Sequence, residues 1–135
     1  MRISSKGRYA LKLAADVAQY EKLGPVSLRE ISERTGLSVK YLEQLAGVLV
    51  RGNVLQSKRG ARGGYVLARD AHEISAGEVL RLSEGSTAPV ACLDEDAGLC
   101  PHRSECGTIG FWTGLDQAIE GYVDSVSLAD MGTNV

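Results

Sequence analysis

The chain has 135 residues, of which 44% are hydrophobic and only 5% aromatic, a composition typical of one small globular unit with an aliphatic core. No stretch approaches the ~18 apolar residues that cross a membrane, and the first residues lack the apolar core of a signal peptide. We therefore expect a cytoplasmic protein with no membrane partner, in which clustered cysteines hold metal or do redox chemistry rather than form structural disulfides.

The net charge of −2 hides an asymmetry along the chain. Residues 1–70 contain 13 basic residues (Lys and Arg) and 6 acidic residues (Asp and Glu). Residues 71–135 contain 2 basic and 11 acidic residues. A balance of +7 in the first half beside −9 in the second indicates that the first half meets a polyanion and the second does not.

Three helices are predicted in the first part of the chain. Apolar spacing predicts a helix over residues 6–22. A capping-box pattern opens a second helix over residues 27–34, and a capping serine opens a third over residues 38–51. Two short helices joined by a tight turn at Gly36 are typical of a helix-turn-helix.

A β-hairpin is predicted next, because strand-like runs at residues 54–58 and 65–67 flank a loop rich in Gly and Arg. A helix-turn-helix followed by such a hairpin is a winged helix. A further helix is predicted over residues 75–83. Residues 108–126 carry an apolar stripe at helical spacing that includes the only Phe and the only Trp, and the last residues are expected to fray.

The predicted fold is therefore mostly α with a small β-hairpin. It comprises a winged helix-turn-helix DNA-binding domain at residues 1–84, a cysteine-containing cluster-binding loop at 85–107, and a dimerisation helix and tail at 108–135. The stripe on the last helix is also compatible with plain intramolecular core. Because the preceding domain is expected to form a closed core of its own, we expect the stripe to pack against a second copy of the chain in a homodimer.

The predicted reading surface centres on the helix at residues 38–51, since the second helix of a helix-turn-helix enters the major groove with its N-terminal part. Lys40 can neutralise a phosphate, and Ser38 and Tyr41 can donate to one. Gln44 can bond adenine edges, and Glu43 can accept from a cytosine amino group. The alternative is an ordinary solvated helix face.

Two further basic segments favour DNA over that alternative. The loop of the hairpin carries Lys58, Arg59 and Arg62 among glycines, and arginine suits a narrow, electronegative minor groove. The start of the first helix, where free backbone N–H groups favour a phosphate, adds polar and basic candidates, namely Arg2, Ser4, Lys6 and Arg8.

The cysteines of the chain, Cys92, Cys100 and Cys106, fall within fifteen residues. Their spacing, C-x7-C-x5-C, matches neither the paired knuckles of zinc fingers nor the common ferredoxin runs. It favours an iron–sulfur cluster while leaving zinc and free redox thiols open. His102 lies inside the loop and is the nearest candidate for a fourth ligand, with the acidic side chains of the loop as alternatives.

Four segments resemble the IscR-type family of bacterial winged-helix regulators, namely residues 1–10 (MRISSKGRYA), 31–34 (ISER), 41–45 (YLEQL) and 59–65 (RGARGGY). The resemblance implies a homodimer with swapped or crossed long helices that binds palindromic operators in double-stranded DNA. In many members it also implies a [2Fe–2S] or [4Fe–4S] cluster on three cysteines. By position, the ligands here would be the three cysteines, Glu43 would contact a base, and Arg59 would be a wing contact.

Two positions depart from that family pattern. Regulators of iron–sulfur biogenesis place a histidine where this chain has Ile109, and nitric-oxide sensors place an acidic residue where it has Arg8. Neither usual fourth ligand is present, so the cluster type, the signal, and the choice between repression and activation stay open.

Rival functions remain at this point. A zinc- or thiol-based redox-sensing regulator would be colourless, and an iron–sulfur carrier or redox protein would bind DNA weakly and without sequence preference. We do not expect an enzyme, because no nucleophile–base pair or phosphate-binding loop is visible.

Overall fold

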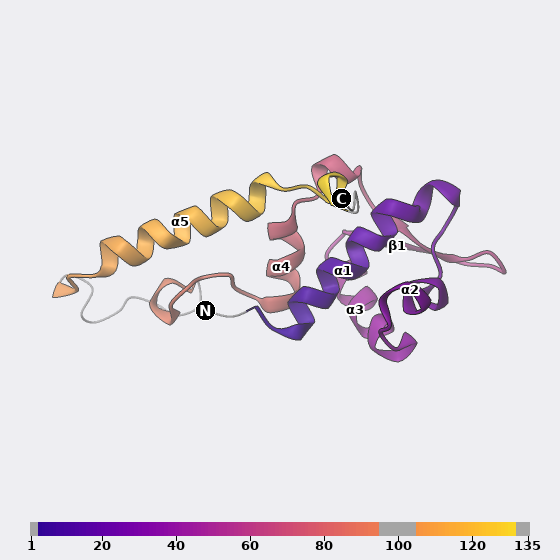
Figure 1. Cartoon of the computed structure of the whole chain (residues 1–135), viewed down its shortest axis with the longest axis horizontal. Coiled ribbons are helices and arrows are strands. Elements are labelled where there is room, and N and C mark those ends of the chain that lie inside the picture. The colour runs from indigo at the N-terminus through magenta and orange to yellow at the C-terminus, as the bar shows by residue number, and fades with distance from the viewer. Residues whose placement is uncertain (1–2, 95–104, 132–135) are drawn as a thin grey trace.

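The computed structural model of the chain describes residues 3–94 and 105–131. Its elements follow in the order α1 (Ser5–Tyr20), η1 (Glu21–Leu23), α2 (Leu28–Thr35), α3 (Val39–Arg51), β1 (Leu55–Lys58), β2 (Gly64–Leu67), η2 (Ala71–Glu73), α4 (Ala76–Glu84), η3 (Ala91–Leu93), α5 (Ile109–Ser125) and η6 (Leu128–Asp130). The predicted fold, mostly helical with one antiparallel hairpin, is confirmed (Figure 1).

Serine caps set the helix starts as predicted. The hydroxyl of Ser27 accepts from the backbone N–H of Glu30 at 3.2 Å, and that of Ser38 accepts from Tyr41 at 3.1 Å. Each bond satisfies one backbone donor that the first helical turn leaves without a partner. Gly36 ends α2 with a φ of 78°, a left-handed conformation that glycine adopts without strain. This turn separates α2 from α3.

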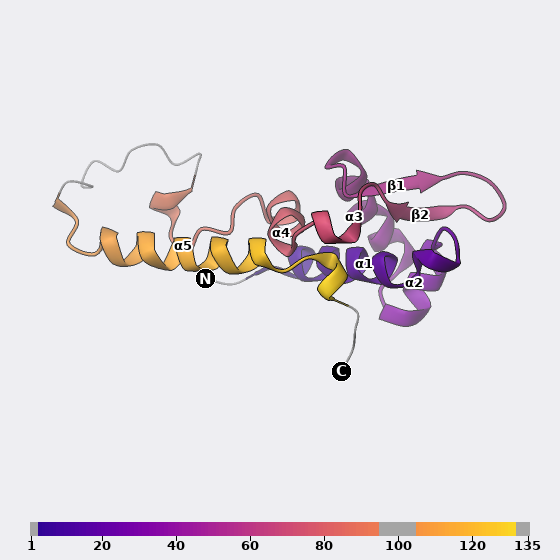
Figure 2. The same cartoon turned by 90° about the horizontal axis from the view of Figure 1, so that it is seen from above.

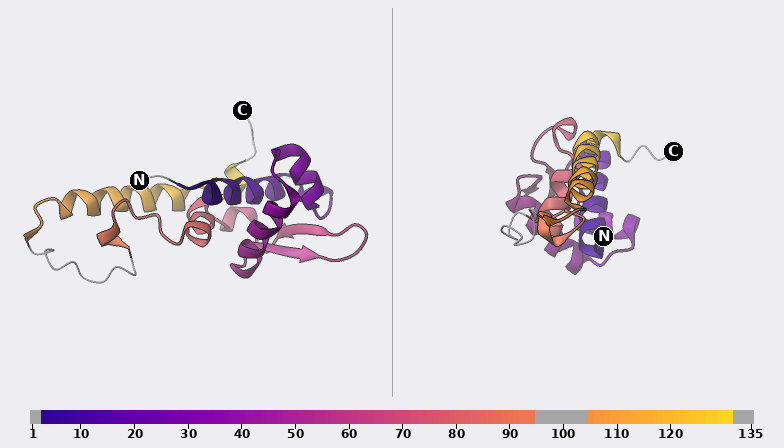
Figure 3. Two further views of the ribbon diagram at one scale, coloured as in Figure 1. Left: turned by 90° about the horizontal axis from the view of Figure 1, so that it is seen from below. Right: turned by 90° about the vertical axis from the view of Figure 1, so that its left-hand side faces the viewer.

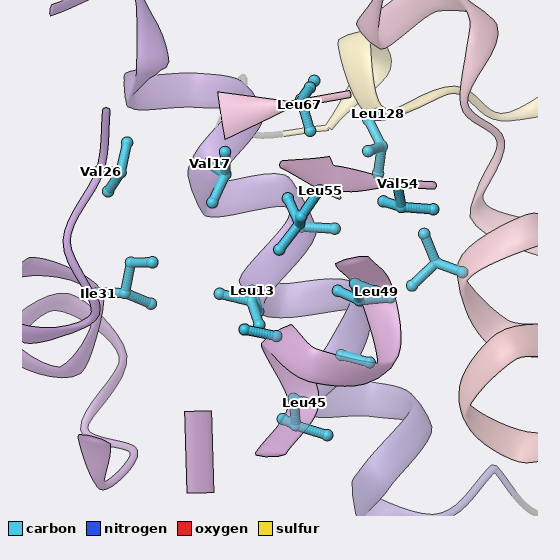
Figure 4. Packing of buried hydrophobic residues seen from close by; sticks show 14 of the residues in the cluster. Leu13, Val17, Val26, Ile31, Leu45, Leu49, Val54, Leu55, Leu67 and Leu128 are labelled. Atoms are coloured by element: carbon cyan, nitrogen blue, oxygen red, sulfur yellow. The ribbon is translucent and has the colours of Figure 1, made fainter. Parts of the chain in front are cut away.

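The core is aliphatic, as the low aromatic content predicts. Leucine, isoleucine and valine from α1, α2, α3 and both strands meet in one cluster, shown in Figure 4. Leu13 from α1, Ile31 from α2 and Leu49 from α3 are fully buried there. Burial of this apolar surface is the main source of stability, and it fixes α3 against α1 so that its other face points to solvent.

The hairpin is tied to the helix-turn-helix through the segment before α2. β1 and β2 pair antiparallel, and Val26 exchanges two backbone hydrogen bonds with Tyr65, of 2.9 and 2.8 Å. Gly64 packs so closely against this segment that an added Cβ would lie 2.9 Å from the backbone nitrogen of Ser27. The rest of the hairpin projects from the domain (Figure 2).

Helix α5 is anchored by its C-terminal half and otherwise leaves the domain (Figures 1 and 3). Arg81 of α4 donates to Glu120 at 2.8 Å and to Asp124 at 2.6 Å. Gly77 allows close approach, since a Cβ there would lie 2.8 Å from Val123. None of the residues of α5 is buried within this chain.

The expectation that the residues after α5 fray is wrong for the part that the structure describes. Leu128 is fully buried in the core. Its backbone N–H donates to Ile74 at 2.9 Å, and the N–H of Ala76 donates to Val126 at 2.8 Å. The few apolar residues around Leu128 form too short a run to give a periodic signal, so the pattern hides this return to the domain. Within the described ranges, no helix has the length and apolar character needed to cross a membrane.

Candidate nucleic-acid interface and cysteine loop

The outward face of α3 carries the side chains predicted to read DNA. Lys40, Glu43 and Gln44 are exposed. Tyr41 is half-buried, with its ring edge-on to Tyr9 of α1 at a centroid distance of 6.0 Å. The contact holds the tyrosine in place while its neighbours remain free to meet a ligand.

A groove of 720 Å³ joins α3 to the start of α1. It is lined by Lys6, Lys40, Tyr41, Glu43, Gln44, Leu45, Gly47, Val48 and Arg51. The structure thus brings Lys6 of α1 together with the candidates on the reading helix. Arg51 and Gly47 line the same groove and were not among the predicted residues, although their helical spacing from Lys40 and Gln44 was visible in the sequence.

The positive side chains of the molecule fall into two groups. One group is ion-paired within the chain, namely Arg29, Arg34, Arg69 and Arg81. In the part of the chain that the structure describes, no ion pair involves the other group, namely Lys6, Arg8, Lys12, Lys22, Lys40, Arg51, Lys58, Arg59 and Arg62. All of this group except Lys12 and Lys22 lie on the reading helix, the wing or the start of α1, so those cations are available to phosphates.

The wing presents its cations at the end of the hairpin. Lys58, Arg59 and Arg62 are all exposed. The turn is closed by a hydrogen bond of 2.9 Å from the N–H of Gly63 to the carbonyl of Gly60, whose φ is 113°. Glycine at these points keeps the loop narrow, as insertion into a minor groove requires.

The start of α1 is held by Glu84, the last residue of α4. One carboxylate oxygen of Glu84 accepts from the backbone N–H and the hydroxyl of Ser4, at 2.9 and 2.5 Å. It also accepts from the N–H of Gly7 at 3.0 Å. Gly7 has to be small, because a Cβ there would overlap this carboxylate. The backbone N–H groups at the start of α1 were expected to be free for a phosphate. Those of Ser4 and Gly7 already have an acidic partner, whereas the side chains of Lys6 and Arg8 are exposed.

We expect Glu84→Ala to lower the free energy of unfolding by about 1–2 kcal/mol, because a charged acceptor at a helix N-terminus is lost. Urea denaturation followed by circular dichroism measures the change. Glu84→Gln, which keeps an acceptor oxygen, should recover part of it. The exposed Glu73 provides the control, and an equal effect of Glu73→Ala would contradict the role given to Glu84.

Two of the three cysteines lie in the described residues, at the end of the molecule away from the hairpin (Figure 2). Cys92 is in η3 and Cys106 precedes α5. Both are half-buried free thiols. Cys100 and His102, like Arg2, lie outside the described residues.

Cys106 has a pKa below its usual value. A side-chain hydrogen bond with Thr108, at 3.5 Å, is the largest cause, followed by the backbone N–H of Thr108. A lower pKa favours the thiolate, which is the form that binds metal or reacts with oxidants.

Thr108→Val should raise the pKa of Cys106, because the hydroxyl partner is removed. In the metal-free protein, alkylation of Cys106 by iodoacetamide should then be slower near neutral pH and reach full rate only at higher pH. Mass spectrometry across a pH series measures this rate. Thr113→Val is a matched control on the same helix, and an unchanged Cys106 profile in Thr108→Val would contradict the assignment.

The described cysteines supply soft sulfur donors of the kind that a thiophilic metal centre uses. Among the described residues no three His, Cys, Asp or Glu side chains gather in a metal-binding group, and that set includes only two of the three cysteines. Soft thiolates select iron–sulfur clusters or zinc. Ile109 is the first residue of α5 and offers no ligand atom.

Comparison with known proteins identifies the relatives of this chain. The Rrf2 family, described as iron-dependent transcriptional regulators, matches residues 3–134. The HTH-type transcriptional regulator IscR of Serratia proteamaculans (strain 568) is 39% identical over 134 residues, which cover 99% of this chain and 80% of that protein.

Solved structures agree in fold. CymR (YrzC), the global cysteine regulator of B. subtilis, superposes with a TM-score of 0.81 at 35% identity, covering 98% of this chain and 97% of CymR. IscR of T. potens superposes with a TM-score of 0.74 at 37% identity, covering 97% and 85%. The first of these relatives is named a transcriptional regulator and CymR a global cysteine regulator, and the solved structures share the fold of this chain. The chain belongs to the Rrf2 family of iron-dependent transcriptional regulators.

Proposed function

We propose that this regulator binds DNA as a homodimer and that an iron–sulfur cluster on Cys92, Cys100 and Cys106 sets its affinity for promoters. The observation that carries the proposal is the separation of two surfaces within one chain. Exposed cations without ion pairs among the described residues cover the reading helix and wing, while free thiols lie at the opposite end. A cluster bound there, [2Fe–2S] or [4Fe–4S], would supply the response to iron, redox state or nitric oxide.

The reading roles follow from the side chains on the DNA-facing surface. Gln44 and Glu43 would contact base edges in the major groove, and Lys40 would contact phosphate. Arg59 and Arg62 on the wing would enter the minor groove.

The dimer would form through α5. Phe111 is 66% exposed and Tyr122 70% exposed in the single chain. With Leu115 and Ala118 between them at spacings of four, three and four residues, they share one helix face. That face points away from Glu120 and Asp124, which hold the helix to α4. A second copy of α5 would cover this face. The dimer would then carry two winged-helix domains, the reading heads, related by a two-fold axis, and such a pair binds a palindromic operator.

The signal has a physical route to the reading head. The cysteine loop begins directly after Glu84, which holds Ser4 and Gly7 of α1. Helix α1 in turn packs on α3 through Tyr9 and Tyr41. A change in the loop that moves α4 or α5 would therefore change the placement of the reading heads. It can alter promoter occupancy only if the two states bind DNA with different affinities.

Duplex selection from a random pool, followed by fluorescence anisotropy over a salt series, tests the DNA-binding part. We expect selected duplexes to bind about 10³-fold or more tightly than random ones at physiological salt. Glu43→Ala should relax the selected sequence at one position. Weak binding that is equal for selected and random duplexes would favour an iron–sulfur carrier instead.

A thiol-sensing regulator is the second candidate, and two observations favour it. The pKa of Cys106 is lowered by its hydrogen bond with Thr108, and CymR, named a global cysteine regulator, shares the fold. This candidate predicts a colourless protein whose DNA affinity changes when peroxide oxidises its cysteines.

A further inference from the structure

We propose that Arg51, together with Lys6 and the open surface of Gly47, forms a seat for a DNA backbone phosphate beside the reading helix. This inference rests on the proposed DNA-binding function and adds a positioning contact that lies outside the base-reading half of α3. Its occupant is a phosphate of the strand that borders the major groove.

The geometry places these residues in line. Lys40, Gln44, Gly47 and Arg51 follow one another at spacings of four, three and four residues, so they share one face of α3. The groove of 720 Å³ contains all four of them, and Lys6 of α1 lines the same groove. A strand that meets Lys40 at the start of the helix would therefore run along this face toward Arg51.

The charges of the groove suit a phosphate. Three cations line it, Lys6, Lys40 and Arg51, against one carboxylate, Glu43. Arg51 is exposed and takes part in no ion pair within the described residues. Its planar guanidinium can donate two parallel hydrogen bonds to phosphate oxygens. Glu43 lies in the first half of α3, about two turns before Arg51.

Gly47 supplies the second observation. A glycine inside a helix makes that helix less stable than an alanine would. No packing within the described structure requires it, because an added Cβ would meet only a guanidinium nitrogen of Arg51, at 3.4 Å. The missing side chain instead leaves room for a close approach from outside the helix, which is what a phosphate backbone needs.

Arg51→Gln tests the seat in the full-length protein by fluorescence anisotropy over a salt series with selected and random duplexes. We expect affinity for both to fall by a similar factor, about tenfold per reading head at 0.1 M salt, and the slope of log K against log salt to become shallower by about 0.9 per head. Lys22→Gln removes an exposed lysine outside the groove and should change neither quantity. An unchanged slope in Arg51→Gln would overturn the seat.

Gly47→Ala separates DNA contact from folding. The substitution should raise the melting temperature, because alanine favours the helix, and should weaken DNA binding, because the methyl group occupies the approach path. A variant that is more stable and binds DNA as well as wild type would overturn the role of Gly47. If Glu43→Ala alters selectivity while both groove variants leave binding unchanged, the seat fails and the proposed function stands. If wild type binds no duplex, both fail.

Discussion

Replacing Phe111 by Glu should convert the proposed dimer to a monomer and weaken binding to a palindromic duplex by about 10²–10⁴-fold. Phe111 is 66% exposed on α5, and its ring packs edge-on against that of Trp112 with 4.9 Å between the ring centroids. A carboxylate at this position would be buried without a partner when two helices meet, which is unfavourable. Loss of the dimer leaves one reading head to bind alone, so the avidity of the pair disappears.

Light scattering coupled to size-exclusion chromatography measures the mass, with the monomer at 14.4 kDa. Anisotropy with the palindromic duplex measures the affinity. Gln117 is exposed on α5 away from the apolar face, so Gln117→Glu adds the same charge as a control and should leave both properties unchanged. A wild-type monomer, or a Phe111→Glu protein that stays dimeric, would contradict the role of α5.

Cys92→Ala should abolish cluster binding. Three thiolates and one further ligand are all that hold the proposed centre, and removal of one sulfur exposes iron to solvent and to loss. Cys92 is half-buried and lies in η3, so replacement by the smaller alanine disturbs little else. We expect the visible absorption of the anaerobically purified protein to disappear, with iron and acid-labile sulfide at background.

Ser86→Ala, in the same loop but without a sulfur ligand, should retain the cluster. Circular dichroism of both variants establishes that the fold is intact. A Cys92→Ala protein with wild-type iron and sulfide would show that this cysteine is no ligand. Wild-type protein without sulfide, even after reconstitution, would contradict the iron–sulfur cluster and favour a regulator that binds zinc or senses oxidants through its thiols.

Local signals in the sequence predicted the elements well. The capping serines Ser27 and Ser38 and the glycine at position 36 act within one turn of their own position, so the helix limits follow from the sequence within a few residues. The hairpin was equally local, since its strands pair across a short loop. The fold class is therefore predictable from local signals, while the family and the DNA-binding role follow from the four resembling segments and the basic surface.

Long-range contacts could not be read from the sequence. Glu84 and Ser4 are eighty residues apart, and neither residue type signals such a partner. Arg81 likewise meets Glu120 and Asp124 only because α5 folds back against α4. Leu128 joins the core through a backbone bridge that no periodic pattern marks. These contacts depend on the tertiary arrangement.

The most direct test of cluster control is an anaerobic anisotropy titration of one selected duplex with cluster-loaded and cluster-free protein at a fixed salt concentration. We expect the two affinities to differ by about 5–150-fold, the usual range of coupling between two sites, and Cys92→Ala to show the cluster-free value under both conditions. Equal affinities for the loaded and cluster-free forms would contradict control by the cluster.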